Sequence, residues 1–224
     1  MPASGWLRSL KPASQAFIDG DMDCLAPLDY PFLNQGQVCE QVECLSGHLG
    51  RLGLEHRRAV IGYSLYTRQL EAVQERTGKA FCAGNCGRPP VGCCNAAHYR
   101  VHSLADFMIG RPSGLAMQLA ASIEGLQRSE DAWSRHEGLT HTSDHCAYLA
   151  ERGCTLLLFK SPRCIHYICP HLEADLLLRF PGAAPAYAAA MSVAAVSTSL
   201  RSADFTSPEV LAAACLMLPG IPGA

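Results

Sequence analysis

The chain has 224 residues, of which 49% are apolar and 17% charged, so it is long and apolar enough to bury a core. Its formal charge of −2 lacks the basic excess typical of nucleic-acid-binding proteins, so we expect no nucleic acid among its partners. Twelve cysteines stand out in this composition and indicate either thiolate metal binding or a disulfide framework.

The start of the chain, M-P-A-S-G-W-L-R-S-L-K-P, lacks the long apolar region of a secretory signal. We therefore expect a reducing, cytoplasmic location, and we favour a metal over disulfides or unremarkable free thiols. Scattered prolines and the acidic turn Gly20–Asp23 predict an irregular arm over residues 1–37, with short helical turns around Ser14–Ile18.

Residues 38–218 are expected to form one domain, followed by a tail over residues 219–224. Helix is predicted from Gln37 to Gly78, with an interruption near Gly47–Gly53. In its second part apolar residues recur at helical spacing and charged residues fall largely on the other side. Thr77-Gly78 is a plausible helix end, so this helix leads directly into a cysteine-rich segment.

The segment from Phe81 to Cys94 reads F-C-A-G-N-C-G-R-P-P-V-G-C-C and forms the first cysteine cluster, over residues 82–94. Its glycines and prolines predict a loop that is neither helix nor strand. It has almost no large apolar side chain to bury, so we expect a metal held by thiolates to order it. The candidate ligands are Cys82, Cys86, Cys93 and Cys94.

Beyond this cluster the sequence predicts two helices, Ser103–Gly110 and Ser113–Arg128, and then a polar connection. His98 and His102 precede them at a spacing that can serve a metal, but we favour two surface or hydrogen-bonded histidines.

The second cysteine cluster, over residues 146–169, holds the candidate ligands Cys146, Cys154, Cys164 and Cys169. A short strand is predicted at Thr155–Phe159, between them. Three helices are expected to follow, over Leu172–Phe180, Pro185–Leu200 and Ser207–Leu218. The most apolar tract, Ala183–Val196, is too short to span a bilayer, so we expect no membrane contact.

The eight cysteines form two groups of four, and each group has enough thiols for one tetrahedral zinc ion or one cubane cluster. Alternatively, the two groups meet and share a centre. Thiolate is a soft ligand, so zinc, iron–sulfur and Cu(I) are candidates and Mg²⁺ or Ca²⁺ are not. The adjacent Cys93 and Cys94 do not fit a zinc knuckle, and the bacterial ferredoxin run C-x₂-C-x₂-C-x₃-C-P is absent.

The combination resembles the YkgJ-type cysteine-cluster family, which is described as zinc- or iron-chelating and has flagellin lysine methylase among its relatives. The matching pieces are C-A-G-N-C-G-R-P-P-V-G-C-C, C-A-Y-L-A-E-R-G-C and S-P-R-C-I-H-Y-I-C, within Cys82 to Pro170, about two fifths of the chain. The first loop is longer than the family pattern, and Ser161 stands where arginine is usual. The resemblance implies metal or cluster ligation by the same eight cysteines; methyl transfer does not follow, because no G-x-G-x-x-G is present.

We therefore expect a mainly α, irregular helical single domain whose cysteine-rich loops are ordered by a metal or an iron–sulfur cluster. The favoured function is a 4Fe–4S protein acting in electron transfer or in cluster-assisted modification of a protein partner. A structural zinc module without catalysis is the alternative, and a dithiol oxidoreductase or metal-trafficking protein is a third. Whether the protein is an enzyme is left open.

Overall fold

The structure is a computed structural model that describes residues 15–27, 29–85, 149–150, 153–154, 162–196 and 208–219, together with residues 125, 128, 129 and 132. This described part is mainly helical, as predicted, and its strands are two residues long each. Most of the predicted helices Ser103–Gly110 and Ser113–Arg128, and the predicted strand Thr155–Phe159, lie outside the described residues. Ordering of the cysteine-rich loops by a metal stays a prediction.

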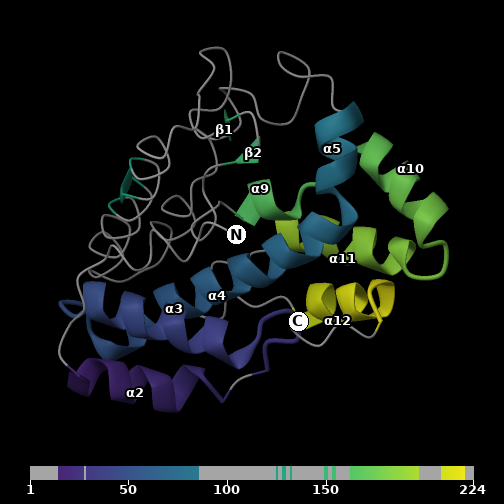
Figure 1. The fold of residues 1–224 in the computed structure, drawn as a ribbon. Coiled ribbons are helices and arrows are strands. Elements are labelled where there is room, and N and C mark those ends of the chain that lie inside the picture. The colour runs from purple at the N-terminus through teal and green to yellow at the C-terminus, as the bar shows by residue number, and fades with distance from the viewer. Residues whose placement is uncertain are drawn as a thin grey trace.

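Three helices make up the N-terminal part of the fold, drawn in purple to blue in Figure 1. They are α2 (Gln15–Leu25), α3 (Gln35–His48) and α4 (Leu54–Thr77). Helix α2 packs on α3 and α4, and α3 also packs on α4. The predicted helix with a break near Gly47–Gly53 is confirmed.

Helix α3 begins in a capping box, which explains why it starts at Gln35. The Gln37 backbone N–H donates to the Asn34 side chain, and the Asn34 backbone N–H donates to the Gln37 side chain, each over 2.9 Å. These two bonds satisfy backbone donors that the first helical turn leaves unpaired.

The sequence-based prediction of an irregular arm is wrong over residues 15–25, which form the 11-residue helix α2. The expected turn at Gly20–Asp23 lies inside this helix. Ile18 and Leu25 are buried against the other helices, and Asp21 is fully buried beside Arg57. Tertiary burial therefore outweighs the low helix propensity of glycine and aspartate.

Helix α4 is the central element, since it packs on α2, α3, α5 and α9. Two of its charged residues are buried: Arg57 is 2% exposed and Glu71 is 8% exposed. Neighbouring elements bring counter-charges to both of them: Asp21 pairs with Arg57 and Lys79 pairs with Glu71.

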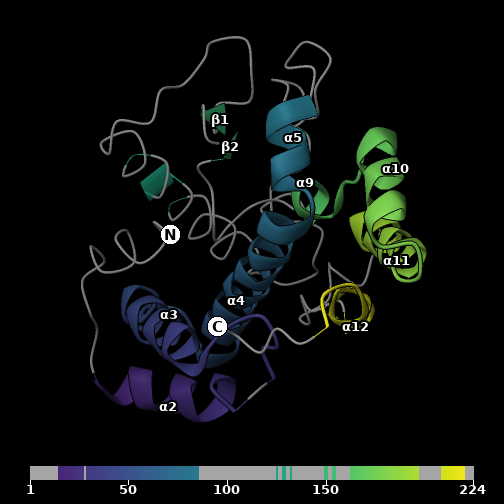
Figure 2. The same ribbon diagram turned by 45° about the vertical axis from the view of Figure 1, so that its right-hand side comes forward.

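Three short elements follow α4 in the described part of the chain. They are α5 (Lys79–Asn85), the hairpin of β1 (Leu149–Ala150) with β2 (Gly153–Cys154), and α9 (Pro162–His166). The strands are antiparallel, with Leu149 opposite Cys154 and Ala150 opposite Gly153. In Figure 1 and Figure 2 the hairpin is drawn above α4, as are α5 and α9.

The C-terminal part of the chain confirms the three predicted helices, with shifted ends. They are α10 (Pro170–Arg179), α11 (Ala184–Val196) and α12 (Pro208–Met217). Helix α11 packs on α9, α10 and α12, and so joins this part to the rest of the fold.

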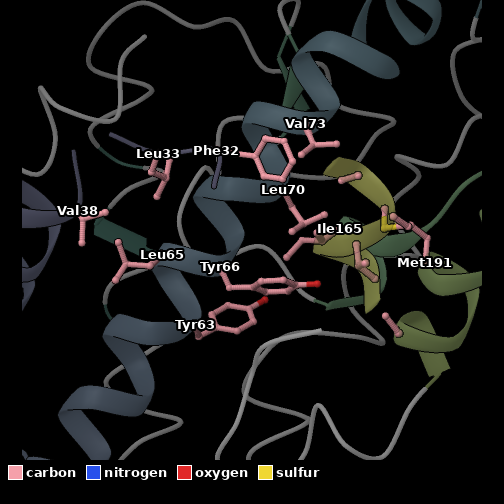
Figure 3. Close-up of a cluster of buried hydrophobic side chains, with 14 of the residues drawn as sticks. Phe32, Leu33, Val38, Tyr63, Leu65, Tyr66, Leu70, Val73, Ile165 and Met191 are labelled. Atoms are coloured by element: carbon pink, nitrogen blue, oxygen red, sulfur yellow. The ribbon is translucent and has the colours of Figure 1, made fainter. Parts of the chain in front are cut away.

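One cluster of buried apolar side chains runs from Leu25 to Met217 and includes residues of both groups of helices. Figure 3 shows its centre, where Leu70 of α4 lies near Ile165 of α9. The largest side chains in the cluster are fully buried tyrosines, Tyr63 and Tyr66 of α4 and Tyr187 of α11. Among the described helices, none combines the length and apolar character that crossing a bilayer requires.

Candidate functional site

Four of the eight predicted ligand positions lie in residues that the structure describes. Cys82 lies on α5, Cys154 in β2, Cys164 on α9, and Cys169 directly before α10. Helix α5 packs on α4 and α10, while α9 packs on α4 and α11. Cys82 and Cys169, which are 87 residues apart in the chain, therefore lie on α5 and directly before α10, two helices that pack on each other (Figures 1 and 2).

Cys82 lies on a helix, not in the loop that the sequence predicted. After Gly78 the chain starts α5 at once, and the Cys82 backbone N–H donates to the Gly78 carbonyl over 2.9 Å. Phe81 is half-buried against the core, whereas the Cys82 side chain is exposed. Helix α5 covers Lys79–Asn85, and most glycines and both prolines of the predicted loop follow Asn85 in the sequence.

Cys164 lies on α9 and is exposed, whereas the two residues that follow it in this helix are buried. Ile165 and His166 are each 1% exposed. The Gln74 side chain of α4 donates to the Ile165 carbonyl over 2.6 Å. The Tyr66 hydroxyl and His166 Nε2 are 2.7 Å apart, in a hydrogen bond between buried side chains.

Cys169 is the N-cap residue of α10. Its backbone is extended, with φ −77° and ψ 156°, and its sulfur accepts a hydrogen bond from the Leu172 backbone N–H over 3.4 Å. Pro170, which the sequence pattern placed at the end of the cysteine segment, is the first residue of this helix, where a missing N–H has no cost. The Cys169 sulfur thus lies at the helix terminus that favours negative charge.

Helix α10 is held at the α4–α5 junction by two contacts. A Cβ atom added to Gly78 would lie 3.3 Å from Leu172 Cδ2, so the backbone there passes close to α10. Arg179 of α10 donates a hydrogen bond to the Thr77 carbonyl at the end of α4. These contacts place the Cys169 end of α10 near the helix that bears Cys82.

The buried phenol of Tyr63 on α4 lies within electrostatic reach of Cys164. Burial raises the pKa of Tyr63 well above its ordinary value, and the nearby Cys164 and Tyr66 raise it further, while a hydrogen bond with Thr67 lowers it. Cys164 therefore lies close to α4.

The other predicted ligands are not placed. Cys86, Cys93, Cys94 and Cys146 lie outside the described residues, as do His98 and His102, and Cys154 is described in its backbone only. Within the described residues, no three His, Cys, Asp or Glu side chains lie close enough together to bind one metal ion. The described thiols are thus candidate members of a ligand set and do not by themselves complete one.

The remaining described cysteines are distributed elsewhere. Cys24 on α2 and Cys215 on α12 are exposed, whereas Cys39 and Cys44 on α3 are half-buried. Cys44 packs against the core, and Cys39 accepts a hydrogen bond from the Gln35 side chain over 3.6 Å.

Sequence reasoning missed the contacts that hold α9, namely those of Tyr66, Gln74 and His166. The Tyr66–His166 bond joins residues 100 positions apart, and the Gln74–Ile165 bond joins residues 91 apart. No local pattern reports contacts at such separations. The one available signal was His166 itself, two residues after a cysteine.

Comparison of this chain with protein-family models, with curated proteins and with solved structures finds no match. Resemblance to the YkgJ-type family stays a prediction that rests on the cysteine motifs.

Proposed function

We propose that this protein binds a metal centre through cysteine thiolates, and that the centre is a 4Fe–4S cluster. Its role would be electron transfer or the cluster-assisted modification of a protein partner in a reducing cytoplasm. One observation carries the proposal: Cys82 lies on α5 and Cys169 directly before α10, two helices that pack on each other, while Cys164 lies on α9, which packs on α4 as α5 does. The cysteine motifs that resemble the YkgJ-type family support it independently.

The donor set fits such a centre in its chemistry. Cys82, Cys164 and Cys169 would supply thiolates, and the remaining ligands would come from Cys86, Cys93, Cys94, Cys146 and Cys154. The Leu172 N–H donates to the Cys169 sulfur, and hydrogen bonds to sulfur are one means by which proteins tune a cluster potential. When bound, the cluster supplies one-electron chemistry, and the protein supplies its ligands and surroundings.

A structural zinc ion is the second candidate, and the shortness of the elements favours it. Helix α5 has seven residues, α9 has five, and each strand of the hairpin has two. Elements this short are marginal on their own. A closed thiolate site contributes folding free energy and would hold them together.

The test is to purify the protein without oxygen, record its visible spectrum, and quantify iron, sulfide and zinc per chain. We expect a brown protein with iron and sulfide in equal amounts. A colourless protein with stoichiometric zinc would contradict the cluster and establish the zinc alternative. A folded protein that neither retains nor takes up any of these metals would exclude both candidates.

Substitution of single thiols tests the ligand set. Cys82→Ser and Cys164→Ser are expected to lower the metal content, because serine is a poor ligand for soft metals. Cys24→Ser is the matched control, since Cys24 is also exposed but lies on α2, far from α5 and α9 in both views. Unchanged metal content in either test variant would remove that residue from the ligand set.

A further inference from the structure

We propose that Tyr66, Gln74 and His166 are positioning residues that fix α9 against α4 and so hold Cys164 in place before a metal binds. The inference rests on the proposed thiolate centre and goes beyond it, since none of these three residues is a predicted ligand. The geometry that points to it is the set of side-chain contacts on both sides of the Cys164 backbone.

The first contact is the buried pair of Tyr66 and His166. The Tyr66 hydroxyl lies 2.7 Å from His166 Nε2, and the two rings stack with centroids 5.7 Å apart. Both residues are 1% exposed, so water does not compete for this bond. A hydrogen bond and a ring contact together restrain both the position and the tilt of the imidazole.

The second contact holds the backbone of the same short helix. Gln74 Nε2 donates to the Ile165 carbonyl over 2.6 Å, and the Ile165 side chain enters the core near Leu70. Tyr66 and Gln74 are eight residues apart on α4, about two helical turns, so they hold α9 from the same side. Ile165 and His166 are therefore both fixed.

Cys164 directly precedes these two anchored residues, yet its own side chain is exposed. A five-residue helix has no stability of its own, so the position of Cys164 depends on these tertiary contacts. These contacts therefore give the exposed Cys164 thiol a defined position beside α4. Residues that orient a metal ligand in this way typically change metal affinity by about 10- to 100-fold.

The test compares Tyr66→Phe with Tyr187→Phe in the full-length protein, with Co²⁺ as the probe. Tyr187 is an equally buried tyrosine whose hydroxyl bonds to Thr77 of α4, so both variants lose one buried hydroxyl that contacts α4. Of these two hydroxyl groups, it is the one on Tyr66 that hydrogen-bonds to α9, at His166. We expect similar losses in the urea midpoint for both variants.

Metal binding should separate the two variants. Tyr66→Phe is expected to weaken Co²⁺ binding by about 10-fold or more in competition with a chelator. It should also lower the thiolate-to-cobalt charge-transfer absorbance, which scales with the number of bound thiolates. Tyr187→Phe should leave both unchanged. In the metal-free protein, hydrogen exchange of the α9 amides should accelerate in Tyr66→Phe alone.

Two outcomes would overturn the positioning role while leaving the proposed function intact: unchanged Co²⁺ binding in Tyr66→Phe, or equal weakening in both variants. Wild-type protein that binds no metal would instead overturn the proposed function, and the positioning role with it. If Tyr66→Phe fails to fold, Gln74→Ala replaces it, with the same expected loss of affinity and faster α9 exchange, and unchanged affinity again overturns the role.

Discussion

At the scale of single residues, the ion pair of Asp21 and Arg57 joins two buried side chains from different helices. Asp21 is fully buried and the Arg57 side chain is 3% exposed. Arg57 donates to both carboxylate oxygens and, over 3.1 Å, to the Leu52 carbonyl. Arg58 adds a second charge 3.4 Å from Asp21 and donates to the Gly20 carbonyl. These contacts attach α2 to α4.

Asp21→Asn should destabilise the protein by about 3–5 kcal/mol, because it keeps the shape of the side chain but removes the carboxylate charge that is buried against Arg57. Urea unfolding followed by circular dichroism measures the loss. Asp19→Asn is the matched control on the same helix; Asp19 is exposed, so we expect a change within about 0.5 kcal/mol. Equal effects of the two substitutions would show that the ion pair is not buried in solution.

At the scale of elements, two glycines of the α4–α5 region show how packing decides the role of a residue type. Gly62 lies inside α4 with no heavy atom within 4 Å of an added Cβ. Gly78 ends α4, and an added Cβ there would lie 3.3 Å from Leu172 of α10. Neither glycine has a positive φ, so backbone strain does not distinguish them; they differ in their place in the helix and in the space around them.

Gly62→Ala should stabilise the protein by about 0.5–1 kcal/mol, because alanine loses less backbone entropy in a helix interior. Gly78→Ala should stabilise it less or destabilise it, since Leu172 must move to admit the methyl group. Thermal unfolding of the two variants beside wild type measures the difference. A larger gain for Gly78→Ala than for Gly62→Ala would contradict the close packing of α10 on the junction.

At the scale of the whole molecule, buried phenols concentrate in the core and couple its stability to alkaline pH. Burial raises the pKa of Tyr63 and of Tyr187 far above the ordinary value. Burial, with a smaller contribution from Cys24, raises the pKa of the half-buried Tyr30 to about 12. The folded state therefore keeps these protons at pH values where the unfolded chain releases them.

Stability should accordingly be constant with respect to these groups below about pH 10 and should fall as pH rises further, since unfolded phenols ionise near pH 10. Tyr63 and Tyr187 together should contribute a slope of about 2.7 kcal/mol per pH unit. Urea unfolding at several alkaline pH values measures the slope, and Tyr187→Phe should reduce it by about 1.4 kcal/mol per pH unit. An unchanged slope in that variant would show that Tyr187 ionises as readily in the folded protein as in the unfolded chain.

Much of the fold was predictable because its signals are local. Apolar periodicity located α4, and the three C-terminal helices were also predicted, with Ser207-Pro208 giving the start of α12 to one residue. The helical class and the cysteine-bearing segments were also readable from the chain. Helix α2 was missed, because Gly20 and the aspartates around it indicate a turn. In the fold Asp21 instead pairs with Arg57, 36 residues away, which the local pattern does not report.

The candidate site shows the same division. By itself the sequence determined which residues offer soft ligands and that they form two clusters, since thiol chemistry and spacing are properties of the chain alone. Only the tertiary structure decided that α5 and α9 both pack on α4, that α10 packs on α5, and that Tyr66 and Gln74 of α4 hydrogen-bond to α9. The physical reason is separation: hydrogen bonds across about 90 to 100 residues depend on how the core packs, and no local pattern encodes that packing.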